Sequence, residues 1–210
     1  MAAPITLYTH RMCPFGQKAH VCLNLVEGIP FAITEVDLYG GGRSKALLLS
    51  LNPAGKVPVL QHGTTVVTES ECILDYIAES FVVVGGKGLH ADDADAERWW
   101  RTTFNEELLP IGKTSVLGSG GGISEKLRGV LNKCEGRLVA ASDSGSGSNF
   151  LAGGPHVSLA DVSGFPFLWR LDDEYDLAAS GYPRLATWLQ RVQSIDAFRS
   201  TVVGSWWWWW

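Results

Sequence analysis

The chain has 210 residues, of which 46% are hydrophobic and 19% are charged, so it is long enough and apolar enough to fold around a buried core. A total of 17 Lys and Arg against 22 Asp and Glu gives a net charge of −5, which disfavours a surface that follows a nucleic-acid backbone. No apolar run approaches the ~20 residues that cross a bilayer, and the first residues lack a signal-peptide pattern. We therefore expect a soluble, cytoplasmic protein with no nucleic-acid partner and no membrane anchor.

The first half of the chain alternates strand and helix patterns. Short apolar runs bounded by turn residues predict strands, and apolar residues at helical spacing behind a capping residue predict helices. In chain order we predict a strand at 5–8, a helix at 14–26, a strand at 31–36, a helix at 44–51, a hairpin at 57–67 and a helix that Ser70 caps. This β-α-β-α-β-β-α order requires a parallel pair of strands, with a loop at Gly40–Gly42, and it ends near residue 85 at a glycine-rich linker.

The second half reads as helical throughout. Acidic residues at 92–95 predict the start of a helix that runs to Pro110, and a second helix covers about 124–141. Ser158 and Asp161 form a capping box at the start of a third helix, Pro183 starts a fourth, and a short one is expected at 195–198. We predict two domains, an α/β domain at 1–84 and an all-α domain at 91–205, and we leave the tryptophan run at 206–210 unassigned.

Cys13 is the strongest candidate for chemistry. Pro14 favours the first helical position, which makes Cys13 the N-cap, where unpaired backbone N–H groups and the helix dipole stabilise a thiolate. A lowered pKa would make this thiol nucleophilic at neutral pH. The other three cysteines, Cys22, Cys72 and Cys134, lie on or near apolar helical faces and are interpreted as reduced, buried side chains. No metal site is expected.

A second group of residues predicts a cleft that binds a peptide. A cis bond at Val57-Pro58 would expose the Val57 N–H and C=O as a strand edge, although an ordinary strand-initial proline is the alternative. Ser70 at a helix N-terminus suits a carboxylate, and Glu69 beside it suits an α-ammonium group. The alternative there is a plain helix cap.

Together, Cys13-Pro14-Phe15-Gly16-Gln17-Lys18, Asn52-Pro53 through Val57-Pro58-Val59-Leu60, Glu69-Ser70-x-x-Ile73 and Ser158-x-x-Asp161 resemble the cysteine-type cytosolic glutathione transferases. Within them the chain is most similar to the omega and dehydroascorbate-reductase classes. The resemblance implies a thioredoxin-like domain that binds the co-substrate glutathione and a helical domain that covers a small oxidised or electrophilic acceptor. It leaves open whether the chain is a homodimer or a monomer.

The resemblance also implies roles for individual residues. Cys13 would be the catalytic thiol with Phe15 beside it, and Val57 and Pro58 would meet the cysteinyl backbone of glutathione. Glu69 and Ser70 would hold its γ-glutamyl end. Lys45 would meet the glycyl carboxylate, with a solvated surface lysine as an equal alternative. For the acceptor site the candidates are Trp99, Trp100 and Trp169, although aromatic residues at helical spacing are more often core.

The implied reaction is thiol transfer, including dehydroascorbate reduction, with a single protein thiol. Gly16 stands where dithiol glutaredoxins have a second cysteine, so a second glutathione would regenerate Cys13. Conjugating transferases use a Tyr or Ser hydroxyl instead, and Tyr8 is the candidate for that, with a core position as the preferred alternative. Two further readings are a relative of the intracellular chloride channel proteins, which share Cys-Pro-Phe, and a ligand-binding or redox-sensing module.

Overall fold

The computed structural model describes residues 3–37, 43–81, 88–117, 122–143 and 149–202. The described residues divide into two compact units, one formed by the residues up to Gly88 together with Thr201 and Val202, the other by Leu89–Ser200. The predicted loop at Gly40–Gly42, most of the linker near residue 85 and the tryptophan run at 206–210 lie outside the described residues.

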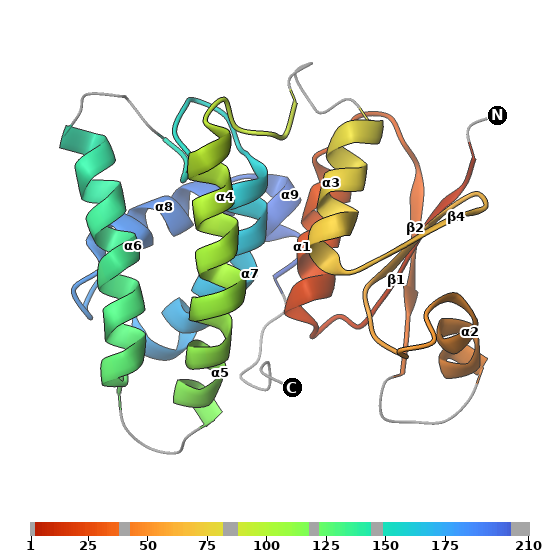
Figure 1. The fold of residues 1–210 in the computed structure, drawn as a ribbon, viewed down its shortest axis with the longest axis horizontal. Helices are drawn as coiled ribbons and strands as arrows, with labels where there is room; N and C mark the ends of the chain where they lie inside the picture. The colour runs from red at the N-terminus through yellow and green to blue at the C-terminus, as the bar shows by residue number, and fades with distance from the viewer. Residues whose placement is uncertain (1–2, 38–42, 82–87, 118–121, 144–148, 203–210) are drawn as a thin grey trace. The chain divides into compact units, whose positions relative to one another are not determined.

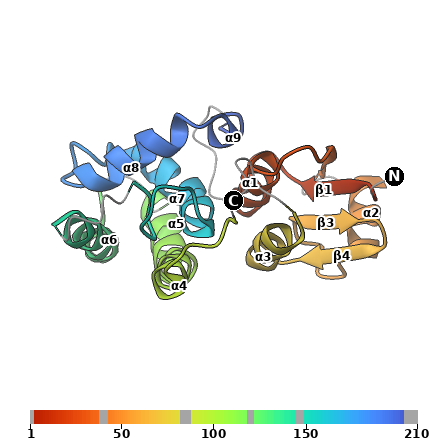
Figure 2. The same cartoon turned by 90° about the horizontal axis from the view of Figure 1, so that it is seen from above.

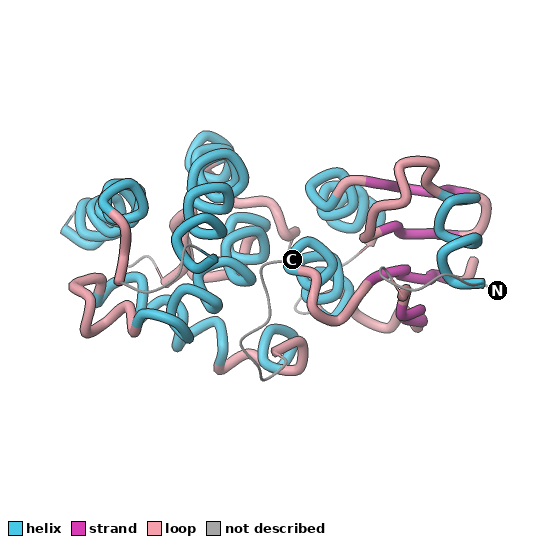
Figure 3. The backbone as a smooth tube through the Cα atoms, turned by 90° about the horizontal axis from the view of Figure 1, so that it is seen from below, coloured by secondary structure: helices cyan, strands magenta, loops and turns pink. Residues whose placement is uncertain are grey.

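The first unit contains a mixed four-stranded sheet with the order β2-β1-β3-β4. Its strands are β1 (Ile5–Thr9), β2 (Phe31–Glu35), β3 (Val59–His62) and β4 (Thr65–Thr68). As predicted, β1 and β2 are parallel, whereas β3 runs antiparallel to β1 and forms a hairpin with β4. Figures 2 and 3 show this sheet with its helices, the thioredoxin-like arrangement that the family resemblance implied.

Three helices cover the sheet: α1 (Pro14–Asn24), α2 (Arg43–Leu51) and α3 (Ser70–Ser80). The helices α1 and α3 pack together on one face and α2 lies against the other (Figure 1). Successive side chains of a strand point to opposite faces, so β1 serves both layers. On the α2 face, Tyr8 packs with Val36, Leu48 and Val59, all three of which are completely buried.

Gly16 allows α1 to approach the end of β1 closely. A β-carbon at this position would lie 1.8 Å from Thr9 Oγ1 and 3.1 Å from Thr9 Cβ, and Thr9 is itself buried. The space that a second cysteine would need is therefore already filled by Thr9, which gives a physical reason for the single-thiol turn.

We expect Gly16→Ala to destabilise the protein by about 1–3 kcal/mol, because overpacking forces neighbouring side chains to move. Urea unfolding measures the effect. In the Thr9→Ala background, where Oγ1 is absent, the same substitution should cost clearly less. Equal costs in the two backgrounds would show that Thr9 does not limit this position.

The end of the described chain returns to the first unit. Gln17 Nε2 donates to the carbonyl oxygen of Thr201 at 3.2 Å and to its hydroxyl at 3.1 Å, and both residues are buried. Thr201 therefore groups with the first unit, and the helical unit ends at Ser200. The predicted domain bounds of 1–84 and 91–205 stay predictions. A contact between residues 184 positions apart has no local sequence pattern.

The second unit is helical, as predicted. It consists of α4 (Ala94–Thr102), the π-helix η1 (Thr103–Leu108), α5 (Leu109–Leu117), α6 (Glu125–Asp143), α7 (Leu159–Tyr175), α8 (Pro183–Gln193) and α9 (Asp196–Arg199). All residues from Leu159 to Leu171 are buried, so α7 is the central helix, and it packs against α4 and α8. Gly164 permits α7 to pack closely against η1 as well, because a β-carbon there would lie 2.3 Å from the ring of Phe104 in η1.

The predicted capping box at the start of α7 is confirmed. The Asp161 carboxylate accepts from the Ser158 backbone N–H at 2.8 Å and from the Ser158 hydroxyl at 2.9 Å. It also accepts from the Leu151 N–H at 2.9 Å and from Trp188 Nε1 at 2.7 Å. Burial raises the pKa of Asp161, whereas these hydrogen bonds act in the opposite direction.

The predicted end of a helix at Pro110 is wrong. The helix that begins at Ala94 passes through the π-helical turn of η1, and Pro110 becomes the second residue of α5. Inside a continuous helix a proline removes one backbone hydrogen bond, and Pro110 follows closely on the π-helical turn, where the regular α-helical bonding is already interrupted. A π-helical turn is rare and has no simple sequence pattern, so the continuation could not be predicted.

Candidate functional site

Three predicted segments meet at one end of the sheet. Tyr8 near the end of β1 is paired with Val59 at the start of β3, and Val59 is paired with Thr68 at the end of β4. The turn that leads to Cys13 follows β1, Val57-Pro58 precedes β3, and Glu69-Ser70 follows β4. The strand register therefore brings the predicted thiol, strand edge and anion site to the same edge of the first unit.

Cys13 is the N-cap residue of α1, as predicted, and Pro14 is the first helical residue. Its backbone N–H donates to the His10 carbonyl at 2.8 Å, and its carbonyl accepts from the Gln17 N–H at 2.9 Å. The residue is partly exposed. The sulfur is thus carried by a backbone that is anchored on both sides, at the positive end of the α1 dipole.

The Val57-Pro58 peptide bond is cis, and Pro58 is buried. Val57 packs against the cluster that Tyr8, Leu48 and Val59 form, so the segment before β3 is tied to α2 as well as to the sheet. Lys45 lies on the same helix one turn before Leu48, and its side chain is exposed. Its predicted role toward the glycyl carboxylate stays a prediction.

Glu69 and Ser70 form the start of α3, one residue earlier than predicted. Glu69 rather than Ser70 is the N-cap, with φ of 66° and ψ of 124°, and Ser70 is the buried first residue of the helix. A non-glycine residue with this backbone costs about 1–3 kcal/mol and is held in place by its surroundings, most often at a binding site. The strain and the N–H groups of the first α3 turn together suit an anionic ligand group.

Sequence reasoning missed two polar side chains behind this edge. Lys18 on α1 is completely buried, and its ammonium group lies 2.8 Å from the carboxylate of Glu71 in the first turn of α3. The same ammonium group lies 5.7 Å from the centre of the Phe15 ring, which is partly buried. A lysine at this place in an amphipathic helix normally faces water, so only the spatial neighbourhood of α3 reveals the ion pair.

Tyr8 occupies the core position that we preferred for it. Only 8% of the residue is exposed, and its hydroxyl donates to Gln61 Oε1 at 2.9 Å. The hydroxyl is therefore used within the sheet, which leaves Cys13 as the better placed candidate for activating a sulfur substrate.

Comparisons with known proteins agree with this geometry. Residues 12–80 match the family model "Glutathione S-transferase, N-terminal domain", and residues 121–191 match "Glutathione S-transferase, C-terminal domain". Glutathione S-transferase L1 of Arabidopsis thaliana is 30% identical over 210 residues, covering 95% of this chain and 82% of that relative. The chain belongs to the glutathione S-transferase family.

Other relatives and solved structures extend this result. The pyrimidodiazepine synthase of Drosophila melanogaster is 28% identical over 90% of this chain and 76% of its own length. The transferase of rice, solved in complex with glutathione, is 26% identical with a TM-score of 0.74 over 97% of this chain and 92% of its own. The Omega 1C transferase of Trametes versicolor shares the fold with a TM-score of 0.77 at 21% identity, over 96% of this chain and 92% of its own. Glutathione is thus the co-substrate that the family uses.

The three tryptophans predicted for the acceptor site of this transferase differ in exposure. Trp100 is completely buried and donates from Nε1 to the Leu151 carbonyl at 2.6 Å, and Trp169 is 7% exposed. Trp99 is partly exposed, with the Arg137 guanidinium 4.3 Å and the Lys133 ammonium 5.2 Å from its ring centre. Of the three, Trp99 has the surface that a ligand could reach within the helical unit.

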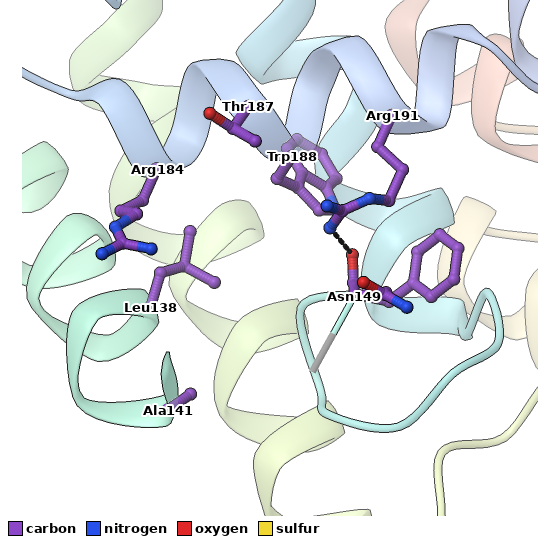
Figure 4. Close-up of a pocket in the computed structure, with 8 residues that line it drawn as sticks. Leu138, Ala141, Asn149, Arg184, Thr187, Trp188 and Arg191 are labelled. Carbon is purple, nitrogen blue, oxygen red and sulfur yellow. Dashed lines mark hydrogen bonds between the residues drawn. The ribbon is translucent and has the colours of Figure 1, made fainter. Parts of the chain in front are cut away.

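The helical unit of the transferase also holds a cavity of about 100 Å³ (Figure 4). It lies between α6, α8 and the segment before α7, and Arg191 donates to the Asn149 carbonyl at its rim. Its lining consists of Leu138, Ala141, Asn149, Phe150, Arg184, Thr187, Trp188 and Arg191. None of these is a cysteine or an acid, so this cavity offers no group for thiol chemistry.

Among the described residues, no group of His, Cys, Asp and Glu side chains is arranged to hold a metal ion. In the same part of the chain, no helix has both the length and the apolar character needed to cross a membrane.

None of the four cysteines of the transferase, all of which lie in the described residues, forms a disulfide, but one expectation about them is wrong. Cys22 and Cys134 are buried, whereas Cys72 is exposed on α3. The inward face of α3 is taken by Ile73 and Ile77, which turns the preceding Cys72 toward solvent. Burial raises the pKa of the Cys134 thiol to about 12.

We expect iodoacetamide to modify Cys13 and Cys72 in the folded protein and to leave Cys22 and Cys134 untouched, because alkylation needs an accessible thiolate. Peptide mass spectrometry after a short exposure at pH 7 reads out each site. Modification of all four at similar rates under native conditions would contradict the described burial.

Proposed function

We propose that this glutathione transferase is a thiol transferase and dehydroascorbate reductase that uses Cys13 as its single nucleophile. The observation that carries the proposal is the partly exposed Cys13 at the N-cap of α1, with Pro14 as the first helical residue. A thiol at this position forms a covalent bond to glutathione, whereas a conjugating transferase keeps glutathione as a free nucleophile. On this ground we propose that the chain belongs to the cysteine-type omega or dehydroascorbate-reductase class.

The reaction consists of two thiol–disulfide exchanges. The Cys13 thiolate attacks the glutathione sulfur of a mixed disulfide, the acceptor leaves as a thiolate that takes up a proton, and Cys13 carries the glutathionyl group. A second glutathione thiolate attacks that group, which releases glutathione disulfide and restores the Cys13 thiolate. Dehydroascorbate offers no disulfide to exchange, so there the Cys13 thiolate and one glutathione thiol together supply the two electrons and the proton that form ascorbate, which leaves Cys13 glutathionylated. A second glutathione thiolate then releases glutathione disulfide and restores Cys13.

Glutathione would lie along the edge where the three segments meet. Val57 would pair with the cysteinyl backbone, and Ser70 with the α3 N–H groups would hold the γ-glutamyl carboxylate. The positive φ of Glu69 supports this placement of the γ-glutamyl end, because strained backbone at a non-glycine residue is found most often at binding sites. Lys45 is exposed on α2 and is proposed to meet the glycyl carboxylate.

The location follows from the co-substrate. Reduced glutathione is abundant in the cytoplasm, where thiols persist, and none of the four cysteines, all among the described residues, forms a disulfide. We therefore propose a cytoplasmic enzyme. The tryptophan run at 206–210 lies outside the described residues and favours neither this enzyme nor a relative of the chloride channel proteins.

Steady-state kinetics at millimolar glutathione test the proposal. We expect turnover of a glutathione mixed disulfide and of dehydroascorbate, and conjugation of an aryl halide at a much lower rate. Conjugation without any reductase turnover would establish a conventional transferase instead. Glutathionylation of Cys13 without turnover of either substrate would establish a redox-sensing module.

A further inference from the structure

The turn that presents Cys13 is held by a carboxylate from the neighbouring strand. Glu35 is the last residue of β2, and both of its carboxylate oxygens accept from the backbone N–H of Arg11, at 3.0 and 3.1 Å. Arg11 lies two residues before Cys13, in the middle of the turn between β1 and α1. A side chain on β2 therefore fixes the backbone of the loop that carries the thiol.

The position of Glu35 is itself set by strand pairing. Glu35 is the register partner of Thr9 at the end of β1, and the pairing continues one step further with the Val36 N–H donating to the Thr9 carbonyl at 2.7 Å. The carboxylate is thus attached to a rigid strand beside the turn. Sites that are built from strands hold their geometry better than sites built from loops alone.

The two backbone N–H groups that follow Arg11 are bonded within the turn. The Met12 N–H donates to His10 Nδ1 at 3.2 Å, and the Cys13 N–H donates to the His10 carbonyl at 2.8 Å. Because Nδ1 accepts a hydrogen bond, neutral His10 carries its proton on Nε2, which lies 3.9 Å from Glu35 Oε1. The Glu35 carboxylate connects this turn to β2 by accepting from the Arg11 N–H. The same carboxylate faces the ring of His10.

We propose that Glu35 is a positioning residue for Cys13: its carboxylate, acting as an acceptor for the Arg11 N–H, holds the thiol at the place where it meets bound glutathione. The proposal rests on the proposed thiol-transfer function. The negative charge of Glu35 opposes a nearby thiolate, so an effect through charge would have the opposite sign. If charge dominated, removing it would make Cys13 more reactive.

Two substitutions separate the acceptor from the charge. Glu35→Ala removes both, whereas Glu35→Gln keeps an oxygen that accepts from the Arg11 N–H. We expect Glu35→Ala to lower kcat for the mixed disulfide by roughly 10-fold, since small displacements of a reacting group are costly. The KM for glutathione should change less than about two-fold, because its binding groups lie on other segments. Glu35→Gln should retain at least about half of the wild-type kcat.

The matched control is Glu79→Ala, which removes an exposed carboxylate near the end of α3 in the same unit. Its kinetics and thermal unfolding should equal those of the wild type. Thermal unfolding of both Glu35 variants shows whether the fold is retained.

A second measurement does not depend on turnover. In the Cys72→Ser background, the rate of Cys13 alkylation by iodoacetamide should fall in Glu35→Ala and be restored in Glu35→Gln. A wild type without turnover would sink the proposed function, while the alkylation rates would still test the positioning role. Three results would overturn the positioning role of Glu35. The first is an unchanged kcat and alkylation rate in Glu35→Ala, the second is faster alkylation in that variant, and the third is an equal loss in both Glu35 variants.

Discussion

Replacing Cys13 by serine is expected to abolish reduction of the glutathione mixed disulfide, with a loss of at least about 10³-fold in kcat. A serine hydroxyl is not ionised at neutral pH, and it forms no disulfide with glutathione. The substitution changes one atom at a partly exposed position, so the fold should be retained. Steady-state rates with purified protein measure the loss, and urea unfolding verifies the fold.

Two control variants make this result specific. Cys72→Ser makes the same exchange at the exposed thiol of α3 and should leave the rate unchanged. Tyr8→Phe removes the hydroxyl that donates to Gln61 and should keep most of the reductase activity. A Cys13→Ser variant that retains the activity, combined with loss of activity in Tyr8→Phe, would reverse the assignment of the reacting group.

Replacing Asp161 by alanine is expected to cost at least about 3 kcal/mol of unfolding free energy. The completely buried carboxylate accepts four hydrogen bonds, from two backbone N–H groups, one hydroxyl and one indole. Each buried donor that is left without an acceptor costs about 1–3 kcal/mol. The loss is large because this one side chain links the start of α7 to α8 and to the segment before α7.

Urea unfolding measures this cost, with Asp173→Ala as the matched control on the exposed end of the same helix. That control should differ from the wild type by less than about 0.5 kcal/mol. If Asp161→Ala fails to fold, Asp161→Asn, which keeps one acceptor oxygen, should fold with an intermediate loss. An Asp161→Ala protein within about 1 kcal/mol of the wild type would show that the four bonds contribute little.

Features with local causes were predictable from the sequence. Pro14 after Cys13 marks a helix start by its fixed φ, and Ser158 with Asp161 marks another by reciprocal hydrogen bonding. The parallel pair of strands and the helical second unit followed from the order of the patterns. The two glutathione S-transferase domain matches at 12–80 and 121–191 fall on these same two halves.

Features that depend on distant neighbours were not predictable. The buried Lys18 owes its position to Glu71, which lies 53 residues further along the chain. Glu35 acquires its place beside the Cys13 turn only through the pairing of β2 with β1. The π-helix η1 carries the chain past Pro110 although proline usually ends such a pattern. Each of these three features depends on the folded arrangement and not on a local sequence pattern.

The most direct test of the account is to identify which atom glutathione bonds to. The protein is incubated with glutathione disulfide, and each cysteine is examined by peptide mass spectrometry before and after addition of reduced glutathione. We predict one glutathionyl group on Cys13 that reduced glutathione removes. An unmodified Cys13 in protein whose fold is intact would contradict a covalent role for this thiol.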